Sequence, residues 1–290
     1  MAMPELPEVE TVRRGLARFF GRDRPRIASV RRSPLPLRAV RWRTVPLARL
    51  AGARLVGVDR HGKVLLLRLD GPATLALHLG MSGRLLADRG EAPRRPHTHL
   101  VLRFDDGRRL RLCDPRRFGS ASALAGHPSG ADLGLGPDAL DHPWTAEAFV
   151  QAFAGTRRTV FDALLDQRRI AGLGNIYVQE LLFEARIDPR AAAGRLARRS
   201  TARLAARVRP LLEAAIRRGG TTLRDFLDPS GHAGTNANAL KVYGQAGAPC
   251  KICGTTLRPL RLGGRTVTSC SRCQRTGRSH TTRATTRLLP

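Results

Sequence analysis

The chain has 290 residues, of which 42% are hydrophobic, so it is long enough for two medium-sized domains and too apolar to be wholly disordered. Lysine and arginine together number 51 against 23 acidic residues, and the formal net charge is +28. Such an excess repels itself unless a polyanion lies nearby, and the lack of a long apolar run or a signal segment argues against a membrane partner. We therefore expect a cytoplasmic protein whose partner is nucleic acid.

Residues 1–125 carry the pattern of a leading helix followed by a β-sandwich. A helix is predicted from Pro7 to Phe20, because proline and glutamate occur in its first turn and apolar residues recur on one face. From residue 27 to about 124 apolar and polar residues alternate, and two Asp-Gly pairs are typical of hairpin turns. One helix and several short antiparallel strands predict an α+β fold that begins with a sandwich.

The rest of the chain divides into four parts. Residues 126–143 are rich in Gly, Pro, Asp and His without a period, which predicts a linker. Residues 144–238 have helical periodicity and end in a Gly/Asn-rich loop, which predicts a helical domain. A cysteine-bearing β module follows at 239–275, and the basic, Thr-rich tail at 276–290 is expected to be disordered. The helices are predicted at residues 145–153, 160–165, 175–185 and 200–218.

Four of the five cysteines form two Cys-x-x-Cys pairs with sixteen residues between them, and these are Cys250, Cys253, Cys270 and Cys273. Two such knuckles are typical of a ribbon whose thiolates surround one structural Zn²⁺, and a module this small needs a metal to fold. Arg265 is predicted at the tip of the hairpin between the pairs, where a cation can enter a groove. The fifth cysteine, Cys113, is expected to be a small buried hydrophobe.

Several loops carry side chains suited to nucleic acid, and most of them have a second interpretation. The Gly-rich turn before Asn175 suits a phosphate at a helix N-terminus, although Asn175 would equally well cap the helix. Arg116 and Phe118 suit a base-edge reader and a wedge, or a solvated face. Met81 suits a second wedge or ordinary core packing. Lys63 offers a compact point charge in a chain that otherwise uses arginine almost everywhere.

Five motifs, taken together, resemble one known family. They are Met3-Pro-Glu-Leu-Pro-Glu-Val-Glu10, Asp114-Pro-Arg-Arg-Phe-Gly119, Gly172-Leu-Gly-Asn-Ile-Tyr177, Gly219-Gly-Thr-Thr-Leu-Arg-Asp-Phe226 and the Cys₄ ribbon. In this order they closely resemble bacterial formamidopyrimidine-DNA glycosylase, over nearly the whole chain from Met3 to about Cys273. The resemblance implies an N-terminal β-sandwich with a leading helix, a helix–two-turn–helix domain and a C-terminal zinc-ribbon finger. It also implies that double-stranded DNA lies in the cleft between the domains.

The resemblance implies roles for the residues at the reaction centre. Pro4 matches the nucleophile whose free α-amine attacks C1′ of the damaged nucleotide and forms a Schiff base. An α-amine suits this role because it is less basic than a lysine and more of it is neutral near pH 7. Glu5 matches the carboxylate that shuttles protons, and Glu8 a second acid near the site. Lys63 matches the lysine that holds a phosphate beside the lesion, and Arg265 the phosphate-binding arginine of the finger.

Further residues match positions that contact DNA. Asn175 matches a phosphate-binding residue of the two-turn motif, and His78 belongs to the same segment as Met81. Met81, Arg116 and Phe118 match the three residues that fill the void left by the flipped base, with Arg116 facing the orphaned cytosine. The implied reaction removes oxidised purines (formamidopyrimidines and 8-oxoguanine) and then cuts the strand by β,δ-elimination. We expect the protein to act as a monomer.

Two alternatives to this function remain open. An endonuclease VIII-type relative would prefer oxidised pyrimidines, although Leu6 and the pair Arg116 and Phe118 favour the purine enzyme. A DNA-binding protein that has lost the chemistry would keep the cleft and the finger. Lesion preference depends on the loop after Gly219, whose segment 234–239 lacks the aromatic residue and the glutamine expected from the family.

Other departures from the family pattern concern single positions. Arg224 stands where a lysine is also found, and Gln245 stands where an arginine is common. Met1 and Ala2 precede the start of the resemblance, so the nitrogen of Pro4 in the full sequence belongs to a tertiary amide and cannot act as a nucleophile. We predict that translation begins at Met3 and that Met3 is then removed, or else that the chain as given carries an N-terminal extension and is inactive.

Overall fold

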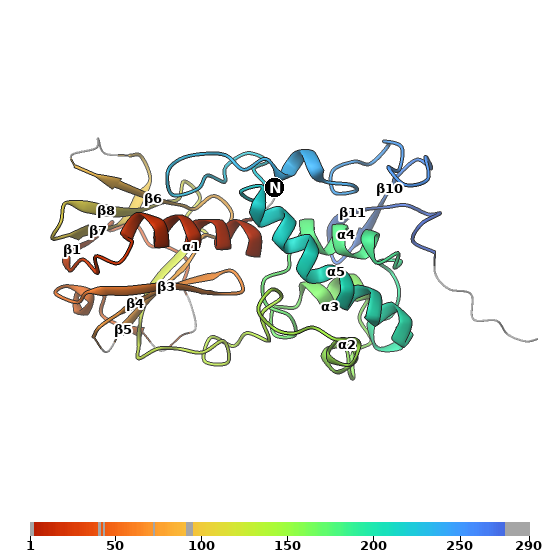
Figure 1. Cartoon of the computed structure of the whole chain (residues 1–290), viewed down its shortest axis with the longest axis horizontal. Coiled ribbons are helices and arrows are strands. Elements are labelled where there is room, and N and C mark those ends of the chain that lie inside the picture. The colour runs from red at the N-terminus through yellow and green to blue at the C-terminus, as the bar shows by residue number, and fades with distance from the viewer. Residues whose placement is uncertain (1–2, 40–41, 43, 72, 91–94, 276–290) are drawn as a thin grey trace, which may run out of the picture.

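The computed structural model describes residues 3–39, 42, 44–71, 73–90 and 95–275. The described chain runs from a β-rich part through a helical part to a small C-terminal hairpin (Figure 1). The tail predicted at 276–290 lies outside the described residues, as do Met1 and Ala2. Within the described part of the chain, no helix is both long enough and apolar enough to cross a membrane.

The first helix, α1 (Leu6–Phe20), begins one residue earlier than predicted and ends at the predicted residue. A capping box starts it, in which the N–H of Glu5 donates to the Glu8 carboxylate at 2.8 Å. Gly21, with a φ of 56°, follows its last turn. The apolar face of α1 is buried in the core of the sandwich and consists of Val9, Val12, Leu16 and Phe20.

Two antiparallel sheets form the sandwich. One has the spatial order β1 (Ile27–Arg32), β7 (Thr98–Phe104), β8 (Arg108–Cys113), β6 (Arg84–Arg89). The other has the order β2 (Thr44–Val45), β9 (Ser120–Ala125), β5 (Ala73–His78), β4 (Val64–Leu69), β3 (Leu55–His61). Alternate leucines of the central strands join one core with α1, as strands with a period of two require. The predicted sandwich and its leading helix are therefore confirmed.

The helical part contains α2 (Ala146–Ala152), α3 (Val160–Leu165), α4 (Asn175–Glu184) and α5 (Arg198–Arg217). Short 3₁₀ turns lie at Leu47–Leu50, Ala193–Arg195 and Asn236–Ala239. The hydroxyls of Thr145 and Thr159 cap α2 and α3 by accepting a backbone N–H of the first turn. Helix α4 is buried along most of its length, whereas α5 buries one face and exposes arginines on the other. A second hydrophobic core lies among these helices.

The segment predicted as a linker, 126–143, consists of turns and bends, but its last residues are firmly packed. Leu133 is buried against the β3–β9 sheet, and Ala139 and Leu140 are buried in the helical core. The segment therefore joins the two parts of the chain through apolar contacts of its middle and of its later residues.

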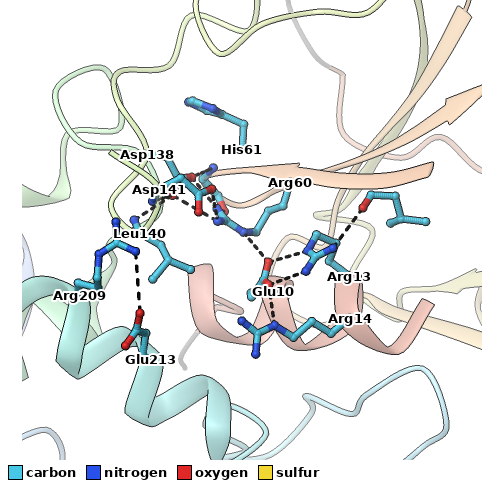
Figure 2. A network of polar contacts seen from close by, with 12 residues as sticks. Glu10, Arg13, Arg14, Arg60, His61, Asp138, Leu140, Asp141, Arg209 and Glu213 are labelled. Atoms are coloured by element: carbon cyan, nitrogen blue, oxygen red, sulfur yellow. Dashed lines mark hydrogen bonds and ion pairs between the residues drawn. The ribbon is translucent and has the colours of Figure 1, made fainter. Parts of the chain in front are cut away.

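A buried ion-pair network reinforces this junction (Figure 2). The guanidinium of Arg60, at the end of β3, donates to Asp138 at 2.5 Å and to Glu10 of α1 at 3.2 Å. Asp138 also accepts from the N–H of Gly62 at 2.6 Å. Although burial raises the pKa of Glu10, hydrogen bonds from Arg13 and its neighbours hold that pKa at about 2. The network therefore fixes the turn after β3 against both α1 and the connecting segment.

The C-terminal hairpin, β10 (Arg258–Leu262) and β11 (Arg265–Ser269), packs its Val267 into the helical core, and a further small core lies beside it. Phe183 of α4 packs there with Val242, Leu257 and the buried cysteines. Gln179 of α4 accepts from the N–H of Thr268 at 2.8 Å and so ties β11 to the helical part. The predicted zinc-ribbon fold is confirmed, with four cysteines gathered beside a β-hairpin.

Candidate functional site

Met3 and Pro4 line a cavity of about 410 Å³, which is within the size range of ligand pockets. Its lining residues are Met3, Pro4, Met81, Thr221, Leu223, Arg224, Asp225, Phe226 and Tyr243. They come from the start of the chain, the loop after β5, the loop after α5 and the segment before the finger. The cavity therefore lies where the sandwich, the helical part and the finger meet.

A second cavity, of about 750 Å³, shares Met3, Met81 and Tyr243 with the first. Four side chains that the sequence singled out line it together, and these are Glu5, Lys63, Asn175 and Arg265. These four come from α1's cap, the β3–β4 turn, the start of α4 and the start of β11. The structure thus brings together residues that are as much as 260 positions apart, Glu5 and Arg265.

The side chain of Glu5 binds to the N-terminus of α4. Its carboxylate accepts from the N–H of Ile176 at 2.8 Å and from the N–H of Tyr177 at 3.3 Å. Gly174 makes this approach possible, because a Cβ there would lie 2.6 Å from Glu5 Oε1. Burial raises the pKa of Glu5 above its ordinary value, although the nearby Lys63 and the backbone N–H groups act in the opposite direction. A carboxyl with a raised pKa keeps its proton to a higher pH than an ordinary glutamate, which suits a group that exchanges protons with a reacting group.

Glu8 lies behind Glu5 and bonds to protein groups on three sides. It accepts from the Glu5 N–H at 2.8 Å, from the Tyr177 hydroxyl at 2.6 Å and from the Thr221 N–H at 2.6 Å. Burial, followed by the charge of Glu5, raises the pKa of Glu8 to about 7. Its contacts therefore connect α1 with α4 and with the loop that lines the smaller cavity.

Lys63 is buried and lies in the turn between β3 and β4. Burial lowers the pKa of its ammonium, while Glu5 and Glu8 raise it and Arg265 lowers it further. These influences show that the two cations and the two carboxylates share one electrostatic environment. Arg265 is exposed and is the first residue of β11. The tip of the hairpin consists of Gly263 and Gly264, so Arg265 lies directly after the tip and not in it.

Asn175 does not cap α4, which corrects one of its two interpretations. The cap residue is Gly174, and Asn175 is the first residue of the helix. The side-chain oxygen of Asn175 accepts from Gln179 at 3.0 Å, and its side chain lines the larger cavity. The helix N-terminus therefore presents Asn175 to the cavity, while its N–H groups at 176 and 177 are taken by Glu5.

The two loops that carry the predicted wedge residues are pinned to each other. Asp114 accepts from the Ser82 hydroxyl at 2.6 Å and from the Gly119 N–H at 2.7 Å. Phe118 is 41% exposed, and the guanidinium of Arg116 stacks on its ring at 4.6 Å. The exposed Phe118 agrees with both interpretations of this loop, a wedge and a solvated face, and the buried Asp114 carboxylate holds the loop in place.

His78 stands at the end of β5, one turn before Met81. Its Nδ1 accepts from the N–H of Gly80 at 3.0 Å. Burial first, and then the charges of Lys63 and Arg38, lower the pKa of His78 to about 4. The imidazole is therefore neutral at physiological pH, and its proton resides on Nε2.

The four finger cysteines form one cluster. The sulfur of Cys250 lies 3.9 Å from that of Cys273, and the sulfur of Cys253 lies 3.5 Å from that of Cys270. All four sulfurs lie within 4.8 Å of one another and can hold a metal ion. Cys113 is buried in β8, outside this cluster, as expected.

Sequence reasoning missed four residues that organise the site, namely Tyr177, Gln179, Glu180 and Tyr243. Tyr243 lines both cavities. Glu180 accepts three successive backbone N–H groups, those of residues 241–243, and so holds Tyr243 in place. A polar Gln-Glu pair inside an otherwise apolar helix was the signal available in the sequence, because such residues are rarely buried without partners.

Comparisons with known proteins agree with this geometry. The family model described as the formamidopyrimidine-DNA glycosylase N-terminal domain matches residues 3–121, and the H2TH domain model of the same family matches residues 135–227. The formamidopyrimidine-DNA glycosylase of Halorhodospira halophila is 45% identical over 280 residues, which cover 94% of this chain and all of that protein. That of Paracoccus denitrificans is 44% identical over 288 residues with the same coverage.

Solved structures give the same result. A Lactococcus lactis FPG variant in complex with DNA containing Fapy-dG has a TM-score of 0.81 at 31% identity, covering 94% of this chain and 100% of that one. The FPG protein of Thermus thermophilus has a TM-score of 0.81 at 35% identity, covering 93% and 98%.

A sandwich, a helix–two-turn–helix part and a Cys₄ finger around a shared cleft define a DNA glycosylase of base-excision repair. The chain belongs to the formamidopyrimidine-DNA glycosylase family.

Proposed function

We propose that the protein excises oxidised purines from double-stranded DNA with Pro4 as nucleophile and then cuts the strand by β,δ-elimination. The observation that carries this proposal is the position of Pro4 and Glu5 where the two cavities meet. The smaller cavity is of a size to accept an extruded base, and the larger one presents cations to the sugar–phosphate backbone.

The chemistry follows from the groups present. The secondary amine of a free Pro4 attacks C1′ as the bond to the base breaks, and the nitrogen loses its proton. Cleavage of the C1′–O4′ bond of the sugar ring then gives an iminium. Glu5, whose pKa is raised, supplies a proton to the opening sugar and can later take one back. The iminium then draws electrons from C2′, so the 3′-phosphate leaves first and the 5′-phosphate second.

The surrounding residues have separate roles in this proposal. Lys63, Asn175 and Arg265 line the larger cavity and bind phosphates on either side of the damaged nucleotide. Met81, Arg116 and Phe118 fill the gap in the duplex, with Arg116 opposite the orphaned base. Glu8 acts through its neighbours, because its carboxylate bonds to Glu5, Tyr177 and Thr221. His78, neutral and behind Met81, offers a donor at Nε2.

We further propose that the cysteine cluster binds one structural Zn²⁺. In a tetrahedron with Zn–S bonds of about 2.3 Å, neighbouring sulfurs are about 3.8 Å apart. The distances of 3.5 and 3.9 Å between the paired sulfurs agree with that geometry. Four thiolates complete the coordination, so this ion would hold the finger and leave the reaction to Pro4 and Glu5.

The processing of the N-terminus decides whether Pro4 can act. Met3 lines both cavities and is bonded to the Pro4 nitrogen, so its removal both creates the amine and opens space beside it. We therefore propose that the active form begins at Pro4.

Borohydride trapping tests this proposal directly. Protein that begins at Pro4 is incubated with duplex DNA containing 8-oxoguanine opposite cytosine, and the reduced Schiff base is counted as a covalent adduct. The matched control keeps one additional residue before Pro4, which blocks the nitrogen and changes nothing else. An adduct with the first protein and none with the second is expected. Equal adduct yields would show that another amine is the nucleophile, and no adduct with either protein would favour a binding protein without the chemistry.

Lesion preference is measured in the same assay. Duplexes with 8-oxoguanine, a formamidopyrimidine or an oxidised pyrimidine are compared at equal concentrations. Faster excision of the two purines is expected, and faster excision of the pyrimidine would favour the endonuclease VIII-type alternative.

A further inference from the structure

The outer face of the four-stranded sheet carries a second basic surface. Leu100, Leu102, Leu110 and Leu112 point into the sandwich core, so the residues between them on β7 and β8 face outward. These outward residues line a groove of about 790 Å³ together with β1 and the residues just before β7. We call it the outer groove, and its basic lining includes Arg31, Arg32, Arg95, His97, Arg103 and Arg109.

The arginines of the outer groove oppose one another in the sheet. Arg103 of β7 is the direct partner of Arg109 on β8, and Arg31 is the partner of Val101, which in turn faces Arg111. Like charges directly opposite each other destabilise an antiparallel pair. Such an arrangement is better tolerated when an anion lies across it.

Acidic side chains neutralise only part of this charge. Asp88 of β6 accepts from Arg111 at 2.6 Å and lies 3.7 Å from Arg109. Arg31, Arg32 and Arg103 form no ion pair with any residue in the described ranges. The outer groove therefore keeps a positive surplus.

His99 gives a second, independent indication of a ligand. It is 3% exposed and lines the outer groove, and its Nε2 donates to the backbone oxygen of Asp114 at 3.0 Å. Its Nδ1 has no hydrogen-bond partner among the described residues. Buried polar atoms without partners are rare in native proteins, so this nitrogen indicates that the groove takes up a further polar group.

The outer groove begins beside a loop that carries two of the proposed DNA-contacting residues. The N–H of Asp114 donates to the backbone oxygen of His97 at 2.9 Å, so the mouth of the groove adjoins the loop that carries Arg116 and Phe118. From His97 to Arg103 the chain extends six residues, about 20 Å at about 3.3 Å per residue. That length corresponds to about six base-pair steps along the axis of a DNA duplex, since each strand advances about 3.4 Å per phosphate along that axis.

We propose that the outer groove binds the phosphate backbone of the duplex flank that leaves the cleft beside Arg116, about half a helical turn beyond it. This inference rests on the proposed function, because the cleft defines where the flank begins. The partner must be a polyanion with regularly spaced charges, since the cationic residues follow the length of β7 and its neighbours.

The test compares two lesion duplexes, a short one that fills only the cleft and one extended by eight base pairs at either end. Binding of the full chain is measured by fluorescence anisotropy at several salt concentrations. The variant is R103A/R109A, and the control is R199A/R207A, which removes the same charge from exposed positions on α5. Both pairs of sites lie outside the cavities around Pro4. Thermal midpoints verify folding, which the R103A/R109A exchange should leave intact because Asp88 keeps its hydrogen bond from Arg111 and the repulsion between Arg103 and Arg109 is removed.

The expected result is specific to length. For the extended duplex, R103A/R109A lowers the slope of log K against log salt by up to about 2, since each lost phosphate contact contributes about 0.9. For the short duplex it leaves both affinity and adduct yield unchanged, and R199A/R207A does not change the difference between the two duplexes. The proposal is wrong if R103A/R109A affects both duplexes equally or neither. Binding of an undamaged extended duplex is measured as well. Because this duplex carries no lesion, its binding reports on the outer groove and does not depend on the chemistry of Pro4.

Discussion

Glu8 accepts a hydrogen bond of 2.6 Å from the N–H of Thr221, although the two residues are 213 positions apart. The same carboxylate accepts from the Tyr177 hydroxyl, so one buried acid joins α1, α4 and the loop of the smaller cavity. Removing one partner from such a network leaves polar groups buried without bonds, which destabilises a protein strongly. The start of the chain is thereby held in position by residues from both halves of the molecule.

The pH dependence of stability should report on Glu8. Its pKa is raised from 4.5 to about 7, so between these values the folded protein holds a proton that the unfolded chain has released. Stability therefore falls as pH rises through this window, by on the order of 3 kcal/mol in total, and levels off above it. Urea unfolding at pH 5, 6 and 7.5 measures the slope.

In the variant Glu8→Gln, the free energy of unfolding should depend less on pH, because glutamine does not titrate and the contribution of one proton to the slope is lost. Glu213→Gln, at a half-exposed position on α5, serves as the control and should retain the slope of the unaltered protein. An unchanged slope in Glu8→Gln would show that Glu8 ionises normally in the folded state.

Arg60 should matter far more for stability than another arginine of the same sheet. Its side chain is 2% exposed and bridges Glu10, Asp138 and Asp141. Arg60→Met should lower the free energy of unfolding by about 3–5 kcal/mol, because buried carboxylates lose their partner. Arg68→Met removes only a surface pair with Asp59 and should change it by less than about 1 kcal/mol. Equal losses in chemical denaturation would contradict a structural role for the network in Figure 2.

Gly174 should be essential for the position of the Glu5 carboxylate. Its backbone is extended, so alanine is sterically allowed for the backbone itself, and the close contacts of the new Cβ with the Glu5 side chain, including Oε1 at 2.6 Å, oppose it. Gly174→Ala should displace the carboxylate, destabilise the fold by about 1–3 kcal/mol and reduce cleavage of an abasic-site duplex more than binding to it. Gly71→Ala, whose new Cβ would meet only an ordinary contact at 3.8 Å, is the control. Normal cleavage by Gly174→Ala would mean that Glu5 needs no fixed position.

The sequence predicted what depends on local pattern, and the structure supplied what depends on distant contacts. The helix α1, the alternating strands and the cysteine pairs follow from neighbours within a few residues, so period and spacing suffice to find them. The bond from Gly62 to Asp138 and the three bonds to Glu180 join segments more than sixty positions apart and leave no local signature. Asn175 shows the limit of a local motif. The Gly-rich turn placed it at the start of α4, but not whether its side chain caps the helix or faces the cavity.

Removal of the metal ion should unfold the finger and leave the rest of the fold intact. The finger core contains few apolar side chains besides the cysteines, so its folding depends on the metal ion. Cys253→Ser should lower the metal content from one zinc per chain towards zero, as measured by elemental analysis. The control is Cys113→Ser, since Cys113 is buried in β8 and lies outside the cluster.

Loss of the metal should weaken DNA binding rather than melt the sandwich. Arg265 begins β11, and β11 is held to α4 by Gln179 only while the hairpin is folded. Cys253→Ser should therefore bind lesion duplex at least about tenfold more weakly, because a phosphate contact and the wall of the larger cavity are lost together. The thermal transition of the sandwich should persist, since its core shares no residue with the finger core. Unfolding of the whole chain in one transition with metal loss would show instead that the finger stabilises both parts.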